Sequence, residues 1–122
     1  MEVSFLDEPR FGWARFTGPW SVDAICASAD RLLAECIARK HQLLLIDWSQ
    51  LETQKVSTLD RYRLAASTLT LSQDLAKVAT VIPPEMIDPE RFGERVAQNR
   101  GMNIRVFPEV KAAQLWLLAD GG

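Results

Sequence analysis

Histidine and cysteine, on which many catalytic and metal sites depend, are scarce in this chain of 122 residues. His41 is the only histidine, and Cys26 and Cys36 are the only cysteines. Structural zinc sites need four such ligands, and a catalytic histidine needs a nucleophile or carboxylate beside it, which Lys40 and Gln42 do not supply. A glycine-rich phosphate loop and a Gly-x-Ser-x-Gly elbow are also missing. We therefore expect no enzyme active site, no metal and no cofactor, and we expect His41 to be a capping or surface residue.

A basic surplus and a long apolar segment are absent as well. Lysine and arginine number 14 against 16 acidic residues, a formal net charge of −2, whereas proteins that bind nucleic acid or anionic lipid are normally basic. The apolar runs are only a few residues long, against the roughly 20 that a membrane span needs. Residues 1–4 lack the basic start of a signal peptide. We expect one cytoplasmic domain over residues 1–122, with no nucleic-acid partner and no membrane insertion.

The two cysteines fall on one apolar stripe of a predicted helix. At a rise of 1.5 Å per residue they stand about 15 Å apart along its axis, too far for a disulfide. We interpret them as small apolar side chains of the core. The alternative is a redox pair or metal site, and a reducing cytosol fits both. The other residues of the stripe are Val22, Ile25, Ala29, Leu32, Leu33 and Ile37.

What the chain does contain is a regular alternation of strand and helix patterns. Residues 43–48 begin as an unbroken apolar run, which is typical of a strand buried on both faces of a parallel sheet. Ser21 is the predicted cap of the first long helix, with Trp20 and Ile25 as its hydrophobic staple. The further strands are predicted over residues 3–7, 10–17, 77–82 and 104–107. The helices are predicted over residues 21–40, from residue 57 or 58 to the 69–74 region, from the Asp88-Pro89 start to Gly101, and from residue 108 onward.

The element order ββαβαβαβα predicts an α/β fold. Strands that alternate with helices favour right-handed crossovers and a largely parallel sheet. The first two strands, separated by Glu8-Pro9, predict an antiparallel hairpin. We expect a mixed five-stranded sheet with about four helices.

Asp47 ends the apolar run, and Ser49 lies in the segment that follows it. In open α/β sheets, ligands and partners bind beyond the carboxyl ends of the parallel strands. Asp47 is predicted either to accept backbone N–H groups and anchor the next loop, or to bind a metal or partner at the rim of the sheet. The carboxylates that could join it, if the loops converge, are Glu52, Asp60, Glu85 and Asp88.

The second helix has apolar residues on two sides. One stripe contains Leu59, Tyr62, Ala66 and Leu69, and the opposite side contains Leu64, Leu71 and Leu75. A helix packed on a sheet needs only one apolar face. The helix could end near Leu69, so that the later leucines pack in a turn. Alternatively, the extra leucines form a partner or self-association surface, or the wall of an apolar pocket.

Three segments together resemble the SpoIIAA-like branch of the STAS superfamily. They are Leu44 to Ser49, Val78 to Ile82, and Arg105 to Leu117, the last with an Ala-x-x-Trp-Leu helix. The resemblance covers about residues 2–118. It implies a small α/β fold whose mixed sheet is flanked by helices on one side, and a function exerted by binding proteins.

Some members of that superfamily are switched by phosphorylation of a serine at the start of the second main helix. The matching hydroxyls here are Ser57 and Thr58, although the Asp and Gly of the Asp-Ser-Ser-Gly-like motif are not kept. A phosphate there would be favoured by the helix dipole and by Arg61. The alternative interpretation is that Ser57 or Thr58 simply caps the helix, which explains the presence of these hydroxyl residues equally well.

These observations predict a non-enzymatic cytoplasmic module that binds a protein partner of unknown identity or a second copy of itself. The predicted working surface combines the loop after Asp47 with the second helix, and its residues are Asp47, Ser49, Ser57, Thr58, Arg61, Leu64 and Leu71. One alternative is a carrier of a small apolar ligand or lipid, built from the same fold. Another is a metal protein or enzyme that uses Asp47 with neighbouring carboxylates.

Overall fold

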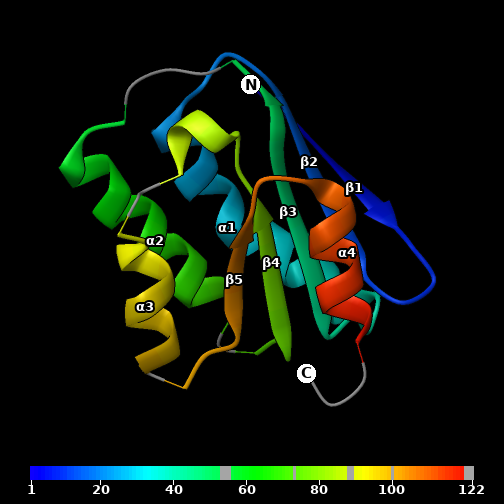
Figure 1. Ribbon diagram of the computed structural model, residues 1–122. Coiled ribbons are helices and arrows are strands. Elements are labelled where there is room, and N and C mark those ends of the chain that lie inside the picture. The colour runs from blue at the N-terminus through cyan, green and yellow to red at the C-terminus, as the bar shows by residue number, and fades with distance from the viewer. Residues whose placement is uncertain (53–55, 73, 88–89, 100, 120–122) are drawn as a thin grey trace.

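The computed structural model describes residues 1–52, 56–72, 74–87, 90–99 and 101–119. Within them, five strands alternate with four α-helices and one short 3-10 helix (Figure 1). The predicted order and most predicted bounds are confirmed. In chain order the elements are β1 (Glu2–Asp7), β2 (Gly12–Gly18), α1 (Val22–Ala38), β3 (Leu43–Leu51), α2 (Thr58–Ser72), β4 (Lys77–Val81), η1 (Pro84–Met86), α3 (Phe92–Asn99), β5 (Ile104–Phe107) and α4 (Val110–Leu118).

The sheet is mixed, as predicted, and its strands lie in the order β1-β2-β3-β4-β5. β1 and β2 form an antiparallel hairpin, and every later neighbour pairs in parallel. Because each crossover is expected to be right-handed and the sheet grows in one direction, α1, α2 and α3 should share one face. α1 contacts α2, and α2 contacts α3.

α4 packs on the other face, against β3, β4 and β5, and lies in front of the sheet in Figure 1. The expectation that helices cover only one side of the sheet is therefore wrong. The physical reason is that α4 follows the last strand and is not a crossover, so no handedness rule places it with the other helices.

Alternate residues of β3 serve two separate cores. Leu44, Ile46 and Trp48 are buried in the core beneath α1 and α2, whereas Leu45 is buried in the core beneath α4. Successive side chains of a strand point to opposite faces, so a strand that is covered on both faces must be apolar at consecutive positions. The interpretation of residues 43–48 as a doubly buried strand is confirmed.

The start of α1 has the predicted cap. The Ser21 Oγ accepts a hydrogen bond from the backbone N–H of Ala24 at 3.2 Å, and Trp20 and Ile25 are both buried in the same core. Ile37 is exposed, so its place on the buried stripe was wrongly predicted. At about 100° per residue, twelve residues turn Ile37 about 120° away from Ile25.

Two other boundaries differ from the prediction. β3 continues to Leu51, because it remains paired with β2 after its pairing with β4 has ended at Asp47. α3 begins at Phe92, and the predicted start at Asp88-Pro89 lies outside the described residues. Gly101 follows the end of this helix with φ +78°, a conformation that suits glycine. In the described part of the chain, no helix is both long and apolar enough to span a membrane.

Candidate functional site

Asp47 is buried and lies inside β3, not in a loop beyond it. Its Oδ1 accepts hydrogen bonds from the backbone N–H of Ser49 at 2.9 Å and from the Ser49 hydroxyl at 2.5 Å. Its Oδ2 accepts from the indole Nε1 of Trp13 at 3.2 Å. Oδ1 thus fixes the local backbone of β3 at Ser49, and Oδ2 joins β3 to Trp13 of β2. The anchoring role is supported, and an exposed recognition role for Asp47 is wrong.

The side chain of Asp47 also points away from the second helix. It has the same strand parity as Leu45, which faces α4, whereas Trp48 faces α1 and α2. Asp47 and α2 therefore lie on opposite sides of the sheet. The predicted working surface therefore does not include the Asp47 side chain, although Val56 of the following loop and residues of α2 line one pocket.

The hydroxyls at the start of α2 are exposed. The Ser57 Oγ accepts a hydrogen bond from the backbone N–H of Asp60 at 3.1 Å, which is the geometry of a helix cap. Thr58 is the first residue of the helix, and Arg61 lies one turn further on. The capping role assigned to Ser57 is confirmed, while phosphorylation at either hydroxyl stays a prediction.

Leu64 and Leu71 are buried in the core, so they do not form an exposed partner surface. The alternative, that the extra leucines line an apolar pocket, agrees with the position of Leu64 in the lining of a pocket. Leu64 and Leu71 are seven residues apart, and two helical turns bring them to the same face of α2. On the other stripe Leu59 is 70% and Tyr62 56% exposed, whereas Leu69 is partly buried against the same core. The sequence shows two apolar stripes on this helix, but only the contacts with α1 and the sheet select the buried one.

A pocket of about 130 Å³ opens between the sheet and helices α2 and α3. It lies at the carboxyl edge of the parallel strands: Trp48 follows the last residue of β3 that pairs with β4, and Ile82 follows the end of β4. This is where α/β sheets usually bind ligands. The lining residues are mainly apolar: Trp20, Trp48, Val56, Arg61, Leu64, Ala65, Thr68, Thr80, Ile82, Met86, Ile87, Arg91, Glu94, Ile104 and Val106.

Two tryptophans form one wall of this pocket. The Trp20 and Trp48 rings meet edge to face, with centroids 5.7 Å apart and planes at 90°. Both residues are almost fully buried, at 8% and 4% exposure. Neither indole Nε1 has a hydrogen-bond acceptor among the described residues. Buried tryptophan N–H groups normally do have one.

Two charged residues that line the pocket, Arg91 and Glu94, form an ion pair with each other. The Arg91 guanidinium contacts Glu94 Oε2 at 3.3 Å and donates to the backbone carbonyl of Val106 at 3.1 Å. The same Glu94 oxygen accepts the backbone N–H of Val106 at 2.8 Å. These contacts fasten α3 to β5 and so fix the shape of this wall.

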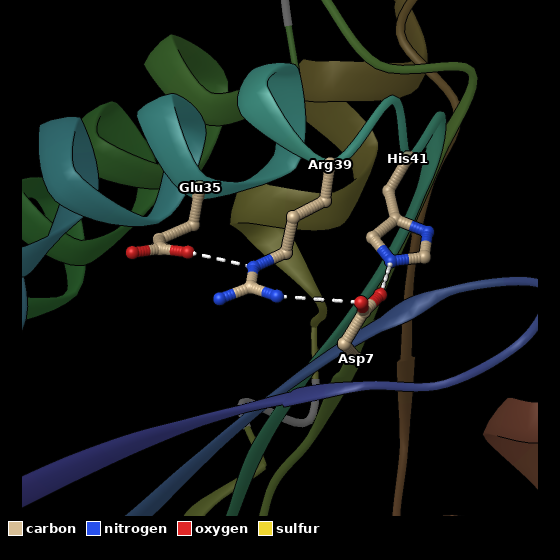
Figure 2. Close-up of polar contacts among 4 residues, drawn as sticks. All are labelled: Asp7, Glu35, Arg39 and His41. Atoms are coloured by element: carbon tan, nitrogen blue, oxygen red, sulfur yellow. Dashed lines mark hydrogen bonds and ion pairs between the residues drawn. The ribbon is translucent and has the colours of Figure 1, made fainter.

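A polar cluster that the sequence did not predict lies at the opposite edge of the sheet. His41 is 8% exposed, and its Nε2 lies 2.5 Å from Asp7 Oδ1 (Figure 2). Arg39 contacts Asp7 at 3.3 Å and Glu35 at 2.9 Å. The hydrogen bond from His41 and the contact with Arg39 lower the pKa of Asp7. The expectation of a surface His41 is wrong, because its partner Asp7 lies 34 positions away in the sequence.

In the described ranges no three His, Cys, Asp or Glu residues are grouped so that they could hold a metal ion. Of the carboxylates proposed to join Asp47, Asp88 lies outside these ranges. Asp60 lies in α2, on the other side of the sheet, and contacts Arg63 at 3.7 Å. The described residues thus do not assemble the carboxylate site that was considered.

Comparison with known proteins identifies the fold. No protein-family model matches the chain, and no curated protein matches it either. The chain is similar to the crystal structure of an uncharacterised protein of the DUF3478 family from Shewanella loihica PV-4, which has a SpoIIAA-like fold. The TM-score is 0.55 at 16% sequence identity, over 95% of this chain and 92% of that chain.

The chain has a SpoIIAA-like fold. This confirms the predicted fold class, including the mixed five-stranded sheet. A structural likeness at 16% sequence identity shows the fold alone, so the function has to be argued from the site.

Proposed function

We propose that this SpoIIAA-like protein binds a small, largely apolar molecule in the pocket between the sheet and helices α2 and α3. The observation that carries the proposal is the pocket itself, since most of its lining side chains are apolar and it lies at the carboxyl edge of the parallel strands. Binding there would remove apolar surface of both ligand and protein from water. The role proposed is binding and not catalysis.

The size of the pocket restricts the ligand. Its volume of about 130 Å³ is close to that of an engineered protein cavity of about 150 Å³ that binds benzene. A single ring or a short aliphatic chain therefore fits, whereas the long chains of a phospholipid do not fit inside. The proposal is thus narrower than a general lipid carrier.

Toluene provides a direct test, because it matches the predicted size and has no polar group. Titration into the ¹⁵N-labelled protein should shift amide signals of residues that line the pocket, such as Leu64, Thr68 and Ile104. Ala65→Phe should fill the pocket and abolish these shifts. The matched control is Ala66→Phe, since Ala66 is exposed on the same helix. Saturable binding that survives Ala65→Phe, or no binding at all, would refute the proposal.

A second candidate function is binding of a protein partner or a second copy of the chain through the outer side of α2. The observation in its favour is that Leu59 and Tyr62, three residues apart and therefore on one face, are large and exposed. Ser57 and Thr58 adjoin this face. A phosphate on either hydroxyl would place negative charge at the helix N-terminus, where it is favourable. We place this activity in the cytoplasm, where the free cysteines would remain reduced.

Light scattering with Leu59→Glu tests self-association, with Thr70→Glu as the control because Thr70 is exposed near the other end of the helix. A dimer that Leu59→Glu converts to a monomer supports the self-associating form. A monomeric wild type refutes that form. Mass spectrometry of protein from its native cells, compared with Ser57→Ala and Thr58→Ala, tests whether either hydroxyl carries phosphate.

A further inference from the structure

One hydroxyl group inside the pocket has no partner in the described part of the protein. Thr80 lies in β4, is only 3% exposed and lines the pocket. Its Oγ1 forms no hydrogen bond among the described residues. In the same ranges, the buried side-chain atoms that are both unpartnered and sealed from water are the indole Nε1 atoms of Trp20 and Trp48. The Thr80 Oγ1 is not one of these sealed atoms, so it borders the open space of the pocket.

The geometry of β4 also directs Thr80 to this side of the sheet. Val78 is buried in the core beneath α1 and α2, whereas Ala79 and Val81 are buried in the core beneath α4. Thr80 has the same strand parity as Val78 and therefore faces α2. Valine has the same branched shape and carries no oxygen that could be left unpaired. A buried hydroxyl without a partner is unfavourable, and a polar group on a ligand would supply that partner.

The charged residues of the lining give no reason for the ligand to be an ion. Arg91 is paired with Glu94 and donates to the backbone carbonyl of Val106, and Arg61 has an interaction of its own. The remaining lining is mainly apolar. Moving an ion from water into such surroundings, with one hydroxyl as its partner, costs more free energy than moving a neutral molecule. The pocket therefore favours a neutral ligand.

We propose that the ligand is a small neutral hydroxy compound, a phenol or a short alcohol, whose hydroxyl pairs with the Thr80 Oγ1 while its apolar body fills the pocket. A hydroxyl both donates and accepts, so it can pair with Thr80 whichever way the threonine proton is turned. This proposal rests on the proposed pocket function and names its ligand class. The volume of about 130 Å³ limits the apolar body to one ring or a short chain.

The experiment compares phenol and benzyl alcohol with toluene, which has the same ring and no hydroxyl. Each compound is titrated into the ¹⁵N-labelled protein, and its dissociation constant is taken from the shifts of pocket amides. A hydroxyl that found no partner in the pocket would lose its hydration without compensation, and its carrier would bind far more weakly than toluene. With Thr80 as the partner, at least one hydroxy compound should bind within about tenfold of toluene or more tightly. Binding of toluene alone would overturn the hydroxyl proposal and leave the pocket function standing.

Thr80→Val removes the hydroxyl and keeps the shape of the side chain. It should weaken binding of the hydroxy compound about tenfold and leave the affinity for toluene unchanged. The matched control is Thr68→Val, because Thr68 lines the same pocket but its Oγ1 already donates to the backbone carbonyl of Leu64 at 2.9 Å. If the affinity for the hydroxy compound survives Thr80→Val, or if Thr68→Val lowers it as much, the role of Thr80 is overturned.

The comparison in the wild type needs no variant, so a variant that fails to fold does not decide the outcome. If none of the three compounds binds, the pocket function is refuted and the hydroxyl proposal with it.

Discussion

The Nε2 of His41 lies 2.5 Å from Oδ1 of Asp7, and this contact joins the end of β1 to the segment between α1 and β3. Asp7 is exposed, while His41 is buried. Arg39, the residue that caps α1, reaches the other oxygen of the same carboxylate. One carboxylate therefore ties the hairpin to the C-terminal end of α1.

This arrangement predicts that the contribution of Asp7 to stability depends on pH. The hydrogen bond with His41 is the main cause that lowers the pKa of Asp7 below its ordinary value of 3.8. A depressed folded-state pKa gives stability that is present above the unfolded pKa and is lost as the pH falls through the folded one. Asp7→Asn should therefore lower the thermal midpoint at pH 7, and the difference from wild type should shrink below about pH 3.8.

Thermal unfolding of both proteins between pH 2 and pH 7 measures this difference. Asp30→Asn, an exposed substitution on α1, serves as the control. A difference that stays constant across this pH range would show that the Asp7 carboxylate is not the origin of the effect.

The orientation of α2 predicts opposite results for two leucines. Leu71 is buried, so Leu71→Ala should lower the free energy of unfolding by about 2–5 kcal/mol through lost burial and a residual cavity. Leu59 is exposed, so Leu59→Ala should change it by no more than about 0.5 kcal/mol. Urea unfolding monitored by circular dichroism checks both. Similar losses for the two variants would contradict the orientation of the helix.

The two cysteines are predicted to differ in reactivity. Burial raises the pKa of the Cys36 thiol to about 11, so at pH 8 only about one thiol in a thousand is in the reactive thiolate form. Cys26 is half-buried, and its thiol lies 3.7 Å from the backbone oxygen of Arg63. Iodoacetamide at pH 8, followed by mass spectrometry, should modify Cys26 first.

Both cysteines should react in urea, which provides the control for reagent and detection. Faster modification of Cys36 in the folded protein would be inconsistent with its position on the buried face of α1.

Lys77 has a structural role that can be tested separately. It is buried in β4, and its Nζ donates to the backbone oxygens of Trp116 at 2.8 Å and Ala119 at 3.1 Å, which caps the end of α4. Lys77→Met keeps the apolar stem but leaves these carbonyls without their donor. We expect a loss of about 1–3 kcal/mol in unfolding free energy. Lys111→Met, at an exposed position on α4, should be nearly neutral in the same urea titration.

The sequence by itself determined the elements and their order. The apolar run into Asp47, the cap at Ser21 and the staple of Trp20 with Ile25 are local patterns, and each appears in the structure where it was expected. Local patterns are readable because a strand alternates every two residues and a helix repeats every 3.6. The element order predicted the mixed sheet, and the resemblance of three segments to a known family implied the SpoIIAA-like fold.

The tertiary structure decided what these patterns could not. It selected Leu64 and Leu71 over Leu59 and Tyr62 as the buried side of α2, because the choice depends on contacts with α1 and the sheet. It also placed Asp47 on the side of the sheet away from α2, since strand parity assigns a face only after the sheet has formed.

The sequence indicated an apolar pocket beside the second helix only as an alternative, and Leu64 does line the pocket, but its other walls depend on the fold. Trp20 and Trp48 are 28 positions apart, and nothing in the chain between them indicates that their rings meet. The order of strands and helices follows from periodicity within short segments, whereas the two indole donors share a wall only because β3 and the start of α1 come together in the folded protein.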